Sequence, residues 1–282
     1  MDVLNDLAYP LSVQTICDLL GVPKGDLHRF QEWSRRSSLL IDLTFLSPDL
    51  LQEALEASHE MGLYFEEMIR ARQDRPGDGL LSSLVSNRGG SDRLIHEEIL
   101  AMATLLFVAG HETTQNLIGN GFLRLCHSPR QLAKVSRNLL LVPGLVEECL
   151  RFDPPVAANG RIAKEDVAIC GHIIRRGHWV HMPLIALNRD PQHVRDPDRF
   201  NIQREDNRHL SFSAGAHFCL GAMLARMVAV TAFERVLSRF EGFRLKTARP
   251  RYRPHVVLRG LEELVVEFQE TRSRKRTAGT TT

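Results

Sequence analysis

A cysteine between two glycines is the residue best suited to chemistry in this sequence. Cys219 lies in the segment FSAGAHFCLG, residues 212–221, and a helix-forming stretch begins directly after it. A helix N-terminus offers unpaired N–H groups and a positive dipole end, which both favour a thiolate over a thiol. Gly215 and Gly221 let the backbone approach a large flat ligand. A thiolate in such a loop suits an axial ligand of haem iron; a buried structural cysteine beside a turn is the alternative.

A second candidate is AGHETT, residues 109–114, which follows an apolar stretch. Glu112 and Thr113 are therefore expected inside the protein, where an acid and a hydroxyl need partners. Gly110 leaves a gap beside the helix for a ligand or water, and an acid–alcohol pair there can pass protons to a bound oxygen species. A glycine kink with a hydrogen-bonded threonine is the alternative. His111 and Glu112 begin the zinc-binding pattern HExxH, but Gln115 replaces its second histidine.

A third candidate is the pair Glu148 and Arg151, whose spacing places both on one helix face. Such pairs are common on protein surfaces and contribute little there. The segment FDPP at 152–155, which stops the helix, makes this pair more specific.

The elements that must position these residues are mostly helices. Ser47 and Pro48 are a typical N-cap and first-turn pair, and Gly21 ends a short helix. Helices are expected at 11–20, 26–40, 47–72, 91–126, from 128, at 143–152 and at 220–240, with breaks at 75–79 and 87–90. Short β-branched runs over 161–182 predict small strands, and the alternation over 256–268 predicts a final hairpin. The fold class is thus mainly α with small β-sheets.

Composition excludes several classes of protein. A chain of 282 residues with 43% hydrophobic residues has a real core, and net charge +2 with 6% aromatic residues speaks against a nucleic-acid partner. The charge-free apolar run 99–110 is too short to cross a membrane, and the N-terminus carries acids where a signal peptide has positive charge. We therefore expect a cytoplasmic monomer without membrane contact. The basic tail 271–282 is expected to be disordered.

In this order, the three segments resemble the cytochrome P-450 superfamily of haem-thiolate monooxygenases, in particular its soluble bacterial members. Connecting segments are also similar, namely NGRIAKEDV, LNRDP, DPDRF, HLSF and AMLAR. The resemblance runs from near residue 5 to near Phe268. It implies a cytochrome P-450 domain over residues 1–270.

The resemblance implies a role for each matching residue. Cys219 is the implied proximal ligand of haem b (iron protoporphyrin IX), and His217 and Arg161 are implied partners of its propionates. Thr113 and Glu112 are implied to manage protons during O–O cleavage. The other implied haem contacts are Ala109, Gly110, Phe212, Gly215 and Gly221.

Two further sets of residues follow from the resemblance. Glu148 and Arg151, with Arg199, are implied to form a structural triad under the haem. A substrate-pocket lining is implied for Val156, Ala157, Ala158 and Asn159. The four other cysteines match no chemical position and are assigned to packing: Cys17, Cys126, Cys149 and Cys170.

This sequence departs from the family pattern in two places. Ser213 stands where the family's loop usually has glycine, so the turn is strained if its φ is positive. Residue 1 also aligns well inside the usual chain, so about the N-terminal third of the family fold is expected to be missing from this sequence. A truncated form, a wrongly called start and a degenerate copy are the alternative explanations. With one side of the haem left open to water, we expect weaker haem retention and poorer solubility.

The functional hypothesis is a monooxygenase of secondary metabolism that inserts one atom of O₂ into a small organic substrate. Its electrons are expected from a ferredoxin or flavodoxin type donor. The alternatives are a catalytically inactive haem-binding or scaffold remnant of such an enzyme, and a purely helical interaction protein. The last alternative leaves the Cys219 loop unexplained.

Overall fold

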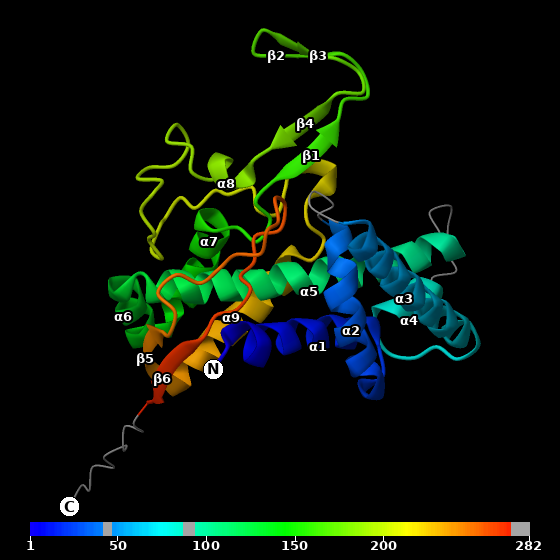
Figure 1. Cartoon of the computed structure of the whole chain (residues 1–282), viewed down its shortest axis with the longest axis horizontal. Coiled ribbons are helices and arrows are strands. Elements are labelled where there is room, and N and C mark those ends of the chain that lie inside the picture. Colours follow the sequence, from blue (N-terminus) through cyan, green and yellow to red (C-terminus); the bar gives the residue numbers. More distant parts are fainter. Residues whose placement is uncertain (42–46, 87–93, 272–282) are drawn as a thin grey trace, which may run out of the picture.

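The structure, a computed structural model, describes residues 1–41, 47–86 and 94–271 (Figure 1). The described chain is mainly helical with small sheets, as predicted. Its α-helices are α1 (Tyr9–Leu20), α2 (Leu27–Ser37), α3 (Pro48–Asp74), α4 (Leu80–Ser86), α5 (His96–Cys126), α6 (Pro129–Arg137), α7 (Val142–Phe152), α8 (Leu184–Leu187) and α9 (Ala222–Arg239). Short π or 3₁₀ turns are η1 (Val3–Ala8), η2 (Lys24–Asp26), η3 (Ser38–Ile41), η5 (Leu139–Leu141) and η6 (Gly215–His217). None of the described helices has both the length and the apolar character needed to cross a membrane.

Helix α5 is the long central helix, which runs across most of the view in Figure 1. Its 31 residues span about 46 Å. Its first half packs on α1, α2 and α3 through Ile99, Ala103 and Phe107, in a core where Phe30 makes edge-on contacts with Trp33, Tyr64, Phe65 and Phe107. Its second half packs on α7 and α9, with Phe122 against Phe233. One helix therefore connects both hydrophobic cores.

Local signals set several helix ends where they were predicted. The Ser47 hydroxyl accepts the N–H of Leu50, and α1 ends at Gly21, whose φ of 77° suits glycine. Helix α5 begins at His96, where the Glu98 carboxylate accepts the N–H of Ile95 at 2.8 Å. The start expected at 91–92, the break at 87–90 and the tail 272–282 lie outside the described residues.

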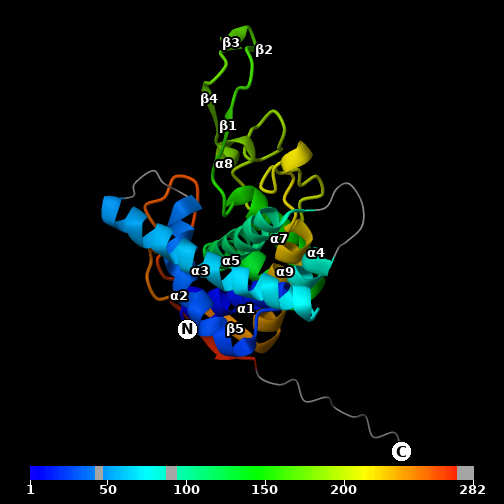
Figure 2. The same cartoon turned by 90° about the vertical axis from the view of Figure 1, so that its right-hand side faces the viewer.

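The described strands form three antiparallel pairs: β1 (Asn159–Ile162) with β4 (Trp179–Met182), β2 (Val167–Ile169) with β3 (His172–Ile174), and β5 (Phe240–Leu245) with β6 (Val266–Glu270). The first two confirm the strands expected over 161–182. The β2–β3 hairpin projects away from the helices in Figures 1 and 2.

The hairpin expected over 256–268 is wrong. Its last residues join β6, which pairs with β5. The rest folds as a loop with isolated bridges from Leu258 to Val156, from Leu261 to Tyr252 and from Val265 to Asp2. Alternation predicts an extended chain but does not select its partner.

Candidate functional site

The Cys219 loop is closed by its own backbone. The N–H of Cys219 donates to the carbonyl of Phe212 at 2.9 Å, and the N–H of Phe218 donates to Gly215 at 3.0 Å. Gly221 is the N-cap of α9, and the N–H of Ala222 donates to the Cys219 carbonyl at 3.3 Å. The Cys219 side chain is partly exposed. The loop thus holds a reachable thiol just before a helix N-terminus.

Backbone conformation explains two positions of this loop. Gly215 has φ of 67°, and a Cβ placed there or on Gly221 would meet nothing within 4 Å. Ser213 has φ of 62° and lies in the left-handed region without the freedom of glycine. Such a conformation costs a residue with a Cβ about 1–2 kcal/mol. The turn is therefore strained at the position where the sequence departs from the family.

Helix α5 carries a row of uncovered side chains. Leu105, Ala109 and Thr113 recur every four residues; Leu105 is 60% exposed, Ala109 is exposed and Thr113 partly so. The Thr113 hydroxyl donates to the Ala109 carbonyl at 2.9 Å. Figure 1 shows the yellow segment of the Cys219 loop passing above α5 before it enters α9.

The loop itself also carries uncovered apolar side chains. Phe218 is exposed and Leu220 is 79% exposed, on either side of Cys219. Exposed apolar side chains, open space at two glycines and a reachable thiol suit a flat apolar cofactor whose metal accepts one thiolate. The described residues contain no cluster of three or more His, Cys, Asp or Glu able to hold a metal. The residues present therefore fit a haem.

The AGHETT segment differs from the expectation at two positions. A Cβ on Gly110 would meet Cδ1 of Ile16 at 2.9 Å, so the lack of a side chain here makes room for α1. Thr113 is partly exposed, whereas Glu112 is buried as expected and its Oε1 accepts Arg253 Nη1 at 2.7 Å. Consecutive helical residues point about 100° apart, so one acid and one alcohol in sequence face different surroundings.

His111 of the same segment is fully engaged in packing. Its Nε2 lies 2.6 Å from the Ser34 hydroxyl and its Nδ1 lies 2.7 Å from the Phe107 carbonyl. Burial lowers the pKa of His111, although the charge of Glu112 and the bond to Phe107 oppose this. The imidazole is therefore a neutral structural group.

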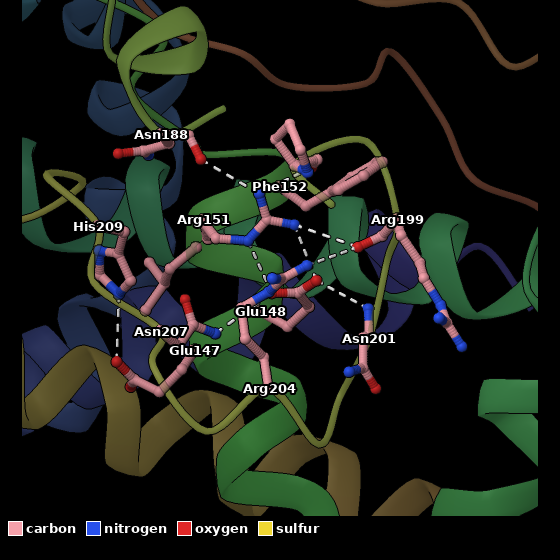
Figure 3. Close-up of polar contacts among 12 residues, drawn as sticks. Glu147, Glu148, Arg151, Phe152, Asn188, Arg199, Asn201, Arg204, Asn207 and His209 are labelled. Carbon is pink, nitrogen blue, oxygen red and sulfur yellow. Dashed lines mark hydrogen bonds and ion pairs between the residues drawn. The ribbon is translucent and has the colours of Figure 1, made fainter. Parts of the chain in front are cut away.

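Glu148 and Arg151 form a fully buried ion pair (Figure 3). Arg151 Nε donates to Glu148 Oε2 and Nη2 donates to Oε1, both at 2.8 Å, and Nη1 donates to the carbonyls of Asn188 and Pro197. This bidentate geometry is the strong form of an Arg–carboxylate contact. The pair fixes the segment after α8 against α7.

The third charged member of this network is Arg204, so the expectation of Arg199 is wrong. Arg204 Nε lies 3.2 Å from Glu148 Oε2. Arg199 contributes only its carbonyl, which accepts Arg204 Nη2 at 2.9 Å and Arg151 Nη2 at 3.4 Å. Figure 3 shows the Arg199 side chain directed away from Glu148. Both arginines lie in one irregular segment, where no periodicity tells which of them turns inward.

Glu147 is a positioning residue that the sequence interpretation missed. Its carboxylate accepts Arg226 Nε at 2.6 Å and Nη2 at 3.0 Å, and His209 Nε2 lies at 3.1 Å. Burial would raise the pKa of Glu147, but the hydrogen bonds from His209 and Arg226 outweigh it and lower the pKa to about 2. The Arg226 guanidinium also lies 4.4 Å from the ring centre of Phe212. Glu147 thereby ties α7 to residues just before and just after the Cys219 loop.

The remaining site residues lie at the edge of this region. His217 and Arg161 are exposed, and Arg161 Nη1 donates to the Gly160 carbonyl at 2.8 Å. The segment 156–159 runs beside a C-terminal segment: Val156 bridges Leu258, and the N–H of Ala157 donates to Val257 at 2.7 Å. Val156, Ala157 and Asn159 are partly exposed, whereas Ala158 is buried.

The other cysteines are free, and three of them pack in the interior as expected. Cys17 and Cys149 are buried and Cys126 is partly buried. Burial raises the pKa of Cys17, helped by Asp18, to about 12, and the pKa of Cys126 to about 11. The packing role assigned to Cys170 is wrong, because it is exposed in the turn between β2 and β3.

A family model described as Cytochrome P450 matches residues 43–260, and the chain belongs to this family. It is 41% identical over 269 residues to the Biotin biosynthesis cytochrome P450 of Bacillus subtilis (strain 168), covering 95% of this chain and 68% of that one. It is 38% identical to the Cytochrome P450 monooxygenase PikC of Streptomyces venezuelae, covering 99% and 66%. The chain thus spans about two thirds of the length of the curated relatives it matches.

Solved structures confirm the cytochrome P450 fold. The crystal structure of P450BioI in complex with hexadec-9Z-enoic acid ligated Acyl Carrier Protein matches with a TM-score of 0.90 and 40% identity, covering 95% of this chain and 69% of that one. The ligand free structure of Cytochrome P450 TbtJ1 matches with a TM-score of 0.90 and 36% identity, covering 95% and 71%.

Proposed function

We propose that residues 1–270 act as one cytochrome P450 domain that binds haem b through Cys219. The observation that carries this proposal is the reachable Cys219 thiol, on a closed loop just before the N-terminus of α9, in a chain of this family. When bound, the haem supplies the activation of O₂ for insertion of one oxygen atom into a small organic substrate. Electrons come from a ferredoxin or flavodoxin type donor. The protein works as a cytoplasmic monomer, like the soluble bacterial members it resembles.

This chain's own residues then have distinct tasks. The Cys219 thiolate is an iron ligand favoured by the N-terminus of α9, and Phe212, Gly215 and Gly221 shape the loop around it. Arg161 and His217 pair with the propionates from the exposed rim. Ala109 would contact the haem from α5, and the exposed side chain of Leu105 would help to exclude water there.

Proton handling falls to the AGHETT segment. The Thr113 hydroxyl lies on the open side of α5 and would be able to hold or pass a proton there once it leaves the Ala109 carbonyl. Glu112, buried on the other side of the helix and paired with Arg253, would be the acid that connects this hydroxyl to the interior through an intervening proton carrier. The substrate is bordered by Val156, Ala157 and Asn159. The ion-pair network of Glu148, Arg151 and Arg204 holds the segment after α8 against α7.

The test is the spectrum of the purified chain titrated with haem. The reduced carbon monoxide complex should show the red-shifted Soret band of a thiolate haem, and Cys219→Ala should abolish it. Cys170→Ala is the matched control, because it removes an exposed thiol far along the chain from this loop. A full thiolate band from Cys219→Ala would refute the proposal. A normal band without any oxygenated product would favour the alternative, an inactive haem-binding protein.

A further inference from the structure

A loop near the C-terminus contacts the AGHETT helix along a buried polar stripe. This C-terminal loop, residues 250–264, meets α5 at three positions spaced by four: Glu112, Asn116 and Asn120. Asn120 Nδ2 donates to the Arg259 carbonyl at 2.8 Å. Residues at this spacing share one helix face. A single loop therefore covers the face of α5 that carries the acid.

The middle contact shows how closely the loop approaches α5. A Cβ placed on Gly260 would lie 2.2 Å from Asn116 Oδ1, so only glycine fits there. The N–H of Arg253 donates to the Gly260 carbonyl at 2.9 Å, which joins the two legs of the loop. The contact between Asn116 and Gly260 thereby fixes the position along α5 at which Arg253 contacts Glu112.

Arg253 is the cationic partner of Glu112 and binds only one of its oxygens. Arg253 Nη1 lies 2.7 Å from Oε1, and Asn116 Nδ2 lies 3.5 Å from the same atom. Among the described residues none donates a hydrogen bond to Oε2. The Glu112 side chain is 6% exposed and that of Arg253 is 30% exposed. A carboxylate this deeply buried depends on its one charged partner, and both of the contacts described for it are made by Oε1.

The same loop also touches the segment proposed to border the substrate. The Val257 carbonyl accepts the N–H of Ala157, and Leu258 bridges Val156. Arg253 is only four residues from Val257. A shift of the substrate-bordering segment can therefore reach Glu112 through one short, hydrogen-bonded stretch of backbone.

We propose that Arg253 is a positioning residue for proton delivery, which anchors Glu112 by Oε1 to the C-terminal loop and leaves Oε2 to exchange protons. The inference rests on the proposed monooxygenase function and deepens it. It makes the C-terminal loop part of the proton pathway, because the contact with Arg253 sets where the Glu112 carboxylate lies.

The first experiment needs no haem. The variants Arg253→Gln, Glu112→Gln and the double variant are unfolded in urea, with Arg251→Gln as the control, because Arg251 is exposed in the same loop. Arg253→Gln should raise the unfolding equilibrium constant about tenfold, which is about 1.4 kcal/mol. In the Glu112→Gln background the same change should have at most a twofold effect, because its partner is gone. Arg251→Gln should change the constant less than twofold.

The second experiment follows the electrons in the haem-loaded chain with its donor. Arg253→Gln should divert several-fold more electrons to peroxide, Arg253→Lys should restore most of the coupling, and Arg251→Gln should have no effect. Substrate KM should stay unchanged, which a merely structural defect would not allow. In the Glu112→Gln background, Arg253→Gln should add nothing further.

Independent, additive effects of the two substitutions in either experiment would overturn the role of Arg253. The thiolate spectrum separates this failure from failure of the proposed function. A chain without that spectrum would overturn the proposed function and this role with it. Additive effects in a chain that shows the spectrum would overturn the role of Arg253 alone.

Discussion

Replacing Arg204 tests whether the buried Glu148 network is built as the structure shows. The Arg204 side chain is 10% exposed and donates four hydrogen bonds: to Glu148 at 3.2 Å and to the carbonyls of Arg195, Asp196 and Arg199 at 2.6, 3.2 and 2.9 Å. Arg204→Gln loses the charge and most of these bonds, while Glu148 keeps Arg151. Each lost bond contributes about 1 kcal/mol net, so we expect a loss of about 3 kcal/mol in the free energy of unfolding.

Arg199→Gln is the matched control, because only the backbone of Arg199 belongs to the network. Its effect should stay within about 0.5 kcal/mol, as for other surface positions. Urea unfolding followed by circular dichroism measures both variants, with equal slopes required for the comparison. If Arg199→Gln were as destabilising as Arg204→Gln, the assignment of the third network member would be wrong.

Three further predictions concern the loop and the long helix. Ser213→Gly should raise the free energy of unfolding by about 1 kcal/mol, because glycine relieves the strain at φ of 62°. Ala214→Gly, at an extended position, should lower the free energy of unfolding. Urea unfolding measures both variants, and a lower free energy of unfolding in both would contradict the strain at Ser213. Burial lowers the pKa of His111, so on acidification the unfolded state takes up this proton before the folded state does. The free energy of unfolding should therefore fall as the pH drops below about 6.5, and His111→Asn should make this pH dependence weaker. Urea titrations at several pH values measure it, and an unchanged pH dependence in the variant would exclude His111 as its source. Thr113→Ala should keep haem binding but divert electrons to peroxide, while Thr231→Ala, which loses a similar hydroxyl bond on α9, should not; equal peroxide yields would remove Thr113 from the proton path.

Features encoded by neighbouring residues could be predicted well from the sequence. Ser47 and Pro48 start α3, and Gly21 ends α1, because capping and left-handed backbone depend on the residue itself. Cys219 could be recognised for the same reason, because ten consecutive residues contain the thiol, the glycines on either side of it and the start of the following helix. The order of three such segments was sufficient for the family.

Partners far apart in the chain could not be predicted in this way. Arg253 meets Glu112 across 141 positions, and Arg204 meets Glu148 across 56. Arg199 and Arg204 have the same side chain and the same charge, so the neighbouring sequence does not tell which of the two side chains enters the core. The alternation over 256–268 likewise predicts extended chain but leaves open that β5 is the partner of β6.

The sequence by itself determined most of the longer helices, several of their ends, the thiol that can hold a cofactor and the family, but not the short helices α4 and α8. Those properties depend on short-range backbone preferences and on the chemistry of single residues. Only the tertiary structure decided which charged groups meet in the interior, that Gly110 serves α1, and that the C-terminal loop covers the polar stripe of α5. The physical reason is that a buried charge selects its partner by position in space, and folding alone brings those positions together.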